Sequence, residues 1–276
     1  YSTPGTDQKS KEIDAAAVEE PRTTAPRPSE KPKVDTPAVP LPNQSQVARR
    51  PPTVGSVPAV SAIVIVIDDL GIDQRRTKKV IALPGPLTLA FLPYGYNLKT
   101  LTASAVANSH ELLVHLPMQP QAVDADPGPN ALLRSLSETE IRNRIEWNLS
   151  RFDGFVGINN HMGSDFTTWE SGMSVVMQEI KARGLLYLDS LTSAKSVAKK
   201  TALANGLSVL TRDVFLDNET DLDRIRSRLS ELEAISRRRG YAIGIGHPYD
   251  QTIEALRKWS KNLESRGFKL TALSGL

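Results

Sequence analysis

The chain has 276 residues, of which 39% are hydrophobic, a formal charge of +3 and no cysteine. Without thiols it is neither a disulfide-stapled scaffold nor a cysteine-ligated zinc module. Its basic clusters, at positions 75–79 and 237–239, lie in segments with helical patterning. A solvated helix face explains them, so we expect no nucleic-acid partner.

The first 58 residues differ from the rest in composition. They hold 11 of the 19 prolines, but only Tyr1 of the 15 aromatic residues. Such a segment buries too little apolar surface to offset its chain entropy, so we predict a disordered, Pro-rich tether over 1–58 and one folded domain over 59–276. A spacer of this kind is typical behind a signal peptide or membrane anchor, which predicts a periplasmic or cell-envelope location. The alternative is a disordered tail on a cytoplasmic protein.

From residue 62 onward, short apolar runs alternate with amphipathic segments, and a glycine precedes several of the runs. This alternation predicts an α/β fold with parallel strands and helices outside them. We favour a deformed (β/α) barrel of seven to eight strands over a doubly wound sheet. The predicted strands are 62–67, 87–92, 112–116, 155–159, 185–188, 207–211, 241–245 and 268–273, and the predicted helices are 73–82, 97–108, 138–152, 168–183, 193–205, 221–239 and 251–266.

Six polar residues lie at or just after the ends of predicted strands, where parallel α/β folds carry their sites. Taken singly, each has a plainer interpretation, because an Asp after a strand often caps a helix and a lone His is often a hydrogen-bonded structural residue. Their convergence on one rim favours shared chemistry. The six are Asp68, Asp69, His115, His161, Asp189 and His247.

Asp68 and Asp69 are adjacent carboxylates, which repel each other unless a positive charge lies between them. A divalent cation would hold one as a ligand and leave the other as a base. Two imidazoles complete a set that suits Zn²⁺ and other divalent transition metals and leaves positions open. The pattern therefore predicts metal-assisted hydrolysis, in which the metal lowers the pKa of a water and polarises a carbonyl.

Several ordered motifs resemble those of polysaccharide deacetylases of the NodB type, and specifically the divergent, YibQ-like family. The resemblance covers about residues 60–276 and implies a deformed (β/α) barrel. The motifs are Asp68-Asp69-Leu70-Gly71, the run from Ser109 to Met118, Asn160-His161-Met162-Gly163-Ser164 and Ile245-Gly246-His247-Pro248.

The resemblance also implies roles for single residues. Asp68 matches the general base, Asp69 a metal ligand, and His115 the first His of a His-x-x-x-His motif whose second position is Gln119. His247 matches the residue that donates a proton to the leaving amine. Asp189 lies where the family has an aspartate that orients the catalytic groups. We expect His161 to replace the missing ligand, and we expect a structural role for His110, at the opposite end of its strand.

The implied activity is removal of acetyl groups from an N-acetylated carbohydrate or peptidoglycan-like polymer, with zinc as the expected metal. Aromatic residues in the predicted rim loops could stack on a sugar: Tyr94, Tyr96, Phe166, Trp169 and Tyr249. Two alternatives remain open at this point. One is a metal hydrolase that cleaves another amide or an ester, and the other is a non-catalytic carbohydrate-binding or scaffold protein of the envelope, which the loss of a histidine at Gln119 favours. The oligomeric state is left open.

Overall fold

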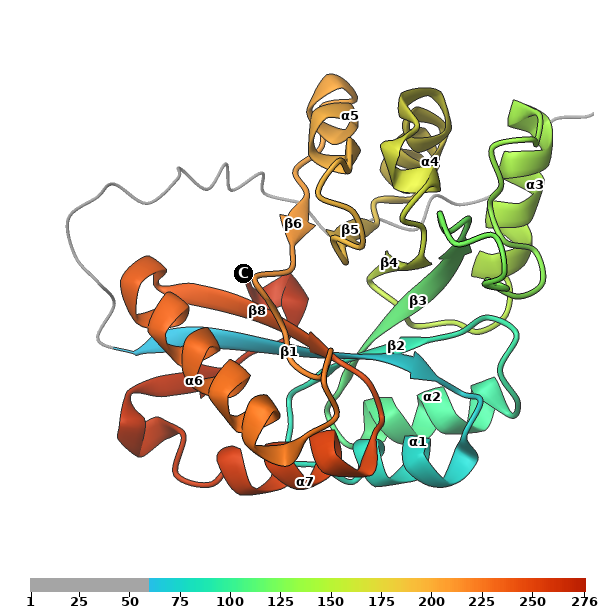
Figure 1. The fold of residues 1–276 in the computed structure, drawn as a ribbon. Coiled ribbons are helices and arrows are strands. Elements are labelled where there is room, and N and C mark those ends of the chain that lie inside the picture. The colour runs from blue at the N-terminus through green and yellow to red at the C-terminus, as the bar shows by residue number, and fades with distance from the viewer. Residues whose placement is uncertain (1–59) are drawn as a thin grey trace, which may run out of the picture. The chain divides into compact units, whose positions relative to one another are not determined.

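The computed structural model describes residues 60–276, and the predicted tether over 1–58 lies outside the described residues. Strands and helices alternate along the chain, as the sequence pattern predicts (Figure 1). The strands are β1 (Ser61–Leu70), β2 (Thr88–Phe91), β3 (Glu111–Met118), β4 (Gly157–Met162), β5 (Leu186–Asp189), β6 (Leu210–Thr211), β7 (Val214–Phe215), β8 (Tyr241–Gly246) and β9 (Phe268–Leu270).

The strands form one parallel sheet in the order β6-β5-β4-β3-β2-β1-β8-β7, and β9 pairs with β1. Within residues 60–276, β6 and β7 are not paired with each other, so the curled sheet is an open barrel. Parallel strands need crossover connections, which the helices provide. The deformed (β/α) barrel predicted from the sequence is confirmed.

The seven α-helices of residues 60–276 connect strands and lie outside the curled sheet (Figure 1). The capping box predicted at Ser137 and Glu140 is present. Gly184 and Gly240, with φ of +65° and +88°, end two helices in the left-handed conformation that glycine tolerates best. The helices are α1 (Gln74–Ile81), α2 (Leu98–Ala107), α3 (Glu138–Leu149), α4 (Glu170–Arg183), α5 (Ala198–Ala204), α6 (Leu222–Arg239) and α7 (Asp250–Trp259).

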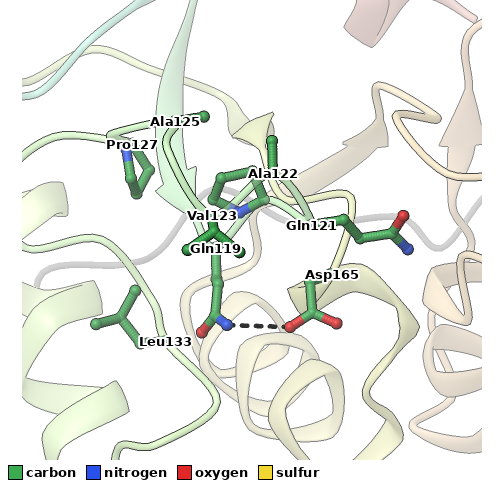
Figure 2. A pocket seen from close by; sticks show the side chains of 9 residues that line it. Gln119, Gln121, Ala122, Val123, Ala125, Pro127, Leu133 and Asp165 are labelled. Carbon is green, nitrogen blue, oxygen red and sulfur yellow. Dashed lines mark hydrogen bonds between the residues drawn. The ribbon is translucent and has the colours of Figure 1, made fainter.

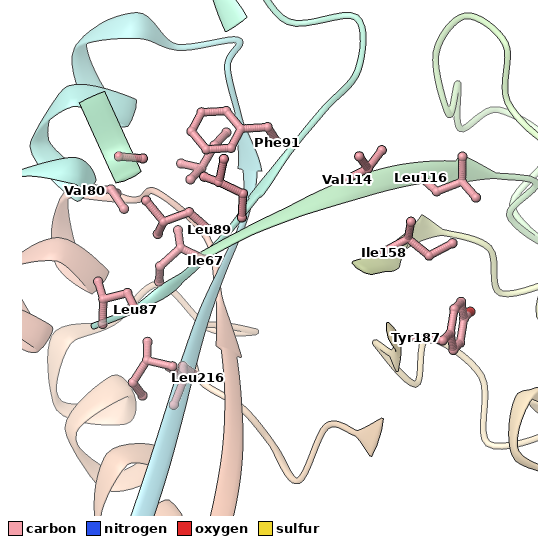
Figure 3. Close-up of a cluster of buried hydrophobic side chains, with 14 of the residues drawn as sticks. Ile67, Val80, Leu87, Leu89, Phe91, Val114, Leu116, Ile158, Tyr187 and Leu216 are labelled. Atoms are coloured by element: carbon pink, nitrogen blue, oxygen red, sulfur yellow. The ribbon is translucent and has the colours of Figure 1, made fainter. Parts of the chain in front are cut away.

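Two apolar clusters mark the two faces of the sheet. Alternate residues of β1 belong to different clusters: Ile65 and Ile67 pack in the large cluster with the helices, whereas Val64 and Val66 pack in the small one. Figure 3 shows part of the large cluster, where Ile67 lies near Leu89 and Val80. Because side chains of a strand alternate between faces, this division tells which polar residues face the barrel interior.

One strand was missed, and several predicted boundaries were wrong. The segment 212–220 contains β7, which is only two residues long and therefore gives little periodic signal. The predicted strand 207–211 is paired only at Leu210–Thr211, and the predicted helix 251–266 ends at Trp259. Among residues 60–276, none of the helices combines the length and hydropathy that crossing a bilayer requires.

Candidate active site

Asp68 and Asp69 reach the same site although neighbouring residues of a strand normally face opposite ways. The register between β1 and β2 shifts between Ile67 and Leu70, and Asp69 has a φ of +58°. Left-handed backbone is unfavourable for most residues but more accessible to Asp. As a result, His115 Nε2 lies 3.7 Å from Asp68 Oδ2 and 3.3 Å from Asp69 Oδ1.

The two histidines of the site come from neighbouring strands. His115 of β3 is in register with Asn159 of β4, and His161 follows Asn159 by two positions, so it shares its face. His161 Nδ1 lies 3.2 Å from His115 Nε2, and the ring centroids are 4.9 Å apart. Asn159 accepts a hydrogen bond from His115 Nδ1 at 2.9 Å.

These side chains fit a metal ion. Asp69 Oδ1, His115 Nε2 and His161 Nδ1 are 2.9, 3.2 and 3.3 Å from one another. Tetrahedral zinc with bonds of about 2.0–2.1 Å separates its ligand atoms by roughly 3.3 Å. Asp69 Oδ1 is buried, and no group among the described residues makes a hydrogen bond to it with acceptable geometry. A cation bound by Asp69, His115 and His161, the predicted ligands, would give this oxygen a partner.

Electrostatics at this point also favour a cation. Burial disfavours the charge of His115, but Asp68 and Asp69 outweigh it and raise the pKa of His115. Burial likewise opposes ionisation of Asp69, but His115 and His161 hold the pKa of Asp69 well below its usual range. Asp69 is therefore ionised at neutral pH, as a metal ligand must be.

Asp68 has a different environment from its neighbour. It is buried on the inner face of the sheet, and Asn159 Nδ2 donates a hydrogen bond of 2.7 Å to its Oδ1. Burial raises the pKa of Asp68, and His115 and His247 lower it in part. A carboxylate whose pKa is raised above its usual range suits a general base.

His247 is held by an aspartate that the sequence analysis did not single out. Asp217 Oδ1 accepts from His247 Nδ1 at 3.0 Å, and Asp217 Oδ2 accepts from the backbone N–H of His247 at 2.6 Å and from Thr252 Oγ1 at 2.7 Å. Burial opposes a charge on His247, yet Asp217, with Asp68 and Asp69, raises the pKa of His247 to about 9. His247 Nε2 lies 3.9 Å from Asp69 Oδ2, so a protonated imidazole borders the candidate metal centre.

Asp217 lies two residues after Phe215, which is in register with Ile245, and His247 lies two residues after Ile245. The register of β7 and β8 therefore carries Asp217 next to His247. A signal was present in the sequence, because Val214-Phe215-Leu216-Asp217 repeats the pattern of an apolar run followed by Asp.

Asp189 lies apart from this group, and the role of orienting His247 falls to Asp217. Leu188 is in register with Asn159 and packs in the inner cluster, so Asp189 faces the other side of the sheet. Its carboxylate accepts from the backbone N–H of Leu191 at 2.9 Å and from Ser196 Oγ at 2.7 Å. Asp189 thus anchors the loop that follows β5.

Gln119, at the position of the missing histidine, is held by other residues (Figure 2). Its Nε2 donates to Asp165 Oδ2 at 3.1 Å, and its Oε1 accepts from the backbone N–H of Arg134 at 2.8 Å. Arg134 in turn pairs with Asp165 at 2.7 Å. Gln119 therefore belongs to a polar cluster beside the site, and His161 completes the candidate ligand set with Asp69 and His115.

His110 lies at the start of β3, away from the rim. Its Nε2 donates to the carbonyl of Ile81 at 2.9 Å, and its Nδ1 accepts from the backbone N–H of Leu87 at 3.2 Å. The ring thus ties the end of α1 to the segment that enters β2, in agreement with the expected structural role.

A cavity of about 450 Å³ opens at the carboxyl ends of the strands. Five of the six predicted residues line it, and Asp189 does not. Its wall also contains Arg212, whose guanidinium donates to the carbonyls of Ser190 and Leu191 at 2.8 and 3.0 Å. The residues that line the cavity are Asp68, Asp69, His115, Asn160, His161, Met162, Ser190, Leu191, Thr192, Arg212, Phe215, Asn218, Ile245 and His247.

An open parallel (β/α) barrel with an Asp-His-His cluster, a second buried Asp and an Asp-paired His at its rim defines the class of deacetylase-like barrels. The profile of the divergent polysaccharide deacetylase family matches residues 65–276, and the chain belongs to that family. It is 35% identical over 202 residues to the uncharacterized protein YibQ of Escherichia coli K12, covering 73% of this chain and 63% of YibQ.

Two solved structures are also similar. The crystal structure of the uncharacterized protein ATU2773 from Agrobacterium tumefaciens C58 has a TM-score of 0.77 at 32% identity, over 82% of this chain and 92% of that one. A mutant of BA3943, a CE4 family pseudoenzyme with restored enzymatic activity, has a TM-score of 0.50 at 13% identity, over 79% and 67% of the two chains. This second likeness concerns the fold alone.

Proposed function

We propose that the protein is a metal-dependent hydrolase that removes acetyl groups from an N-acetylated carbohydrate. The observation that carries this proposal is the meeting, in one cavity, of three side chains placed so that they could hold a metal ion, a buried carboxylate and an imidazole with a raised pKa. A site that only binds sugar has no use for a base and an acid on either side of a cation. Family membership supports the carbohydrate substrate.

Asp69, His115 and His161 would hold the metal, with zinc the best match to two imidazoles and one carboxylate. When bound, such a metal polarises the acetamide carbonyl and increases the acidity of water. Asp68 accepts the proton of the attacking water. Hydrolysis then forms a C–O bond and breaks the C–N bond, which yields acetate and a free amine.

His247 donates the proton that the leaving nitrogen requires. With a pKa of about 9 it carries this proton at neutral pH, and Asp217 holds its Nδ1 so that Nε2 faces the cavity. The base must be deprotonated and the acid protonated at the same pH. Asp68 and His247 fill these two roles because their different surroundings give them different pKa values.

The rim offers some of the aromatic surface that a sugar chain needs. Tyr96 is 67% exposed, and Tyr249 is 36% exposed with its ring 5.7 Å from that of His247. Phe166 is fully buried and therefore packs in the core, so it is no stacking platform. We propose a polymeric substrate of the cell envelope, which fits the predicted tether and envelope location.

A non-catalytic carbohydrate-binding protein is the second candidate, and the replacement of a histidine by Gln119 favours it. Acetate release from N-acetylated oligosaccharides by zinc-treated protein separates the two. We expect wild-type protein to release acetate and Asp68→Asn to lose about 10²–10⁴-fold in rate, because the base is removed while the metal ligands stay. Equal rates in the two proteins would contradict the assignment of Asp68.

A further inference from the structure

We propose that Asn159 is a positioning residue whose side-chain amide fixes the tautomer of His115 and holds the carboxylate of Asp68, so that one group aligns the candidate metal ligand and the candidate base together. The effect of Asn159 on the reaction rate rests on the proposed function. The tautomer of His115 can be measured whether or not the protein is active.

The direction of the hydrogen bonds follows from chemistry. Asn159 is fully buried, and its Nδ2 lies 2.7 Å from Asp68 Oδ1. Asp68 acts as a base in its ionised form, which only accepts hydrogen bonds, so the NH₂ group of Asn159 faces Asp68. The carbonyl Oδ1 of Asn159 must then face His115 Nδ1, at 2.9 Å, and only a protonated Nδ1 can donate to it. In the neutral ring, the lone pair is therefore on Nε2, which faces Asp69 and His161.

The second proton of the amide is also used. Asn159 Nδ2 donates to Ser190 Oγ at 3.2 Å, and the backbone N–H of Ser190 donates to Asn160 Oδ1 at 2.9 Å. A rotated amide would bring its NH₂ against His115 Nδ1–H and its oxygen against the Asp68 carboxylate. Three partners thus fix one orientation, in a place where water cannot substitute for a lost bond.

Substitutions separate the two functions of the amide. Asn159→Asp keeps an acceptor for His115 but places a carboxylate against Asp68. Asn159→Leu removes both bonds at similar volume. Asn148→Leu is the matched control, because Asn148 is also fully buried and hydrogen-bonded, to the carbonyls of Asn130 and Arg144, and none of these three residues lines the cavity.

The tautomer is read directly by long-range ¹H–¹⁵N spectra of ¹⁵N-histidine-labelled, metal-free protein at a pH where His115 is neutral. We expect the Nδ1–H form in the wild type, in Asn159→Asp and in Asn148→Leu, and a shift toward Nε2–H in Asn159→Leu. A wild-type His115 with its proton on Nε2, or an unchanged tautomer in Asn159→Leu, would overturn the proposal.

Metal binding and rate are then measured by Co²⁺ titration, followed by visible absorption, and by acetate release. Loss of a partner behind a metal-bound histidine typically costs about 10–100-fold in affinity. We expect this loss in Asn159→Leu only, whereas Asn159→Asp keeps Co²⁺ affinity and loses rate. If wild-type protein releases no acetate but the tautomer results hold, the proposed function fails while the role of Asn159 stands. If Asn159→Leu binds Co²⁺ as tightly as the wild type, the positioning role is wrong.

Discussion

His247 carries its positive charge because Asp217, whose side chain is fully buried, accepts from both its ring and its backbone. A histidine that served only as packing would not need a buried carboxylate, whose own desolvation is costly. The hydrogen bond between Asp217 and His247 Nδ1 therefore helps keep His247 protonated, as an acid catalyst must be. A pH–rate profile tests this directly.

Asp217→Asn should move the alkaline limb of the pH–rate profile to lower pH. Against the effect of burial, Asp217, with Asp68 and Asp69, raises the pKa of His247 to about 9, so the proton is present below that pH and lost above it. Without the charge of Asp217, burial lowers this pKa and the acid loses its proton earlier. The profile is measured as kcat from about pH 6 to about pH 10.

Asp189→Asn is the matched control for this prediction, because it removes a second buried carboxylate whose partners are Leu191 and Ser196. It should leave the position of the alkaline limb unchanged, even where loosening the loop lowers the rate. A limb that shifts in Asp189→Asn and stays in Asp217→Asn would reverse the two assignments.

His161 and Gln119 provide a second test at the residue scale. His161→Ala removes one of the three candidate ligand atoms and should sharply weaken zinc binding. Gln119→Ala removes hydrogen bonds to Asp165 and Arg134 but no ligand, so its zinc affinity should equal that of the wild type. Isothermal titration with Zn²⁺ measures both. Loss of zinc binding in Gln119→Ala alone would place the third ligand on Gln119.

At the scale of elements, the sheet carries different functions at its two ends. The carboxyl ends hold the candidate site, whereas at the other end His110 joins α1 to the segment before β2. Burial lowers the pKa of His110, against the opposing effect of its bond to Ile81. The ring is therefore neutral in the fold, and its contribution to stability is a matter of packing and two hydrogen bonds.

His110→Ala should lower the free energy of unfolding by about 1–3 kcal/mol, because two buried backbone groups lose their partner. The pKa of His110 is lowered in the folded state, so its contribution is present above the unfolded value of about 6.5 and decreases as the pH falls below it. Urea denaturation above and below this pH measures both effects. A variant as stable as the wild type, with the same acid sensitivity, would contradict this role.

Element order and the barrel could be predicted from the sequence, because apolar runs, helix caps and glycines mark most boundaries. Which side a residue faces was harder to predict. Asp189 and Asp217 both follow apolar runs, and only the register of β5 against β4 and of β7 against β8 tells that one faces the helices and the other His247. The bulge that turns both Asp68 and Asp69 to one side depends on the pairing of β1 with β2, which the sequence of one strand does not reveal.

At the scale of the molecule, residues 60–276 form one barrel whose inner face is apolar in the middle and polar at the carboxyl ends of the strands. Val64 and Val66 fill the interior, and Asp68 continues the same face at the rim. Burial therefore both stabilises the barrel and sets the pKa of its candidate base. The same burial strengthens the attraction between the Asp69 carboxylate and a cation held with His115 and His161.

One measurement tests most directly whether the residues of this cavity, with a bound metal, catalyse hydrolysis of an acetamide. Wild-type protein, stripped of metal and then given increasing Zn²⁺, is incubated with N-acetylated oligosaccharides and peptidoglycan, and acetate and free amine are quantified together. We predict equal amounts of both products, rising with zinc until one ion is bound per chain. Protein that binds zinc yet releases neither product from any of these substrates, or that releases them equally without metal, would contradict the account.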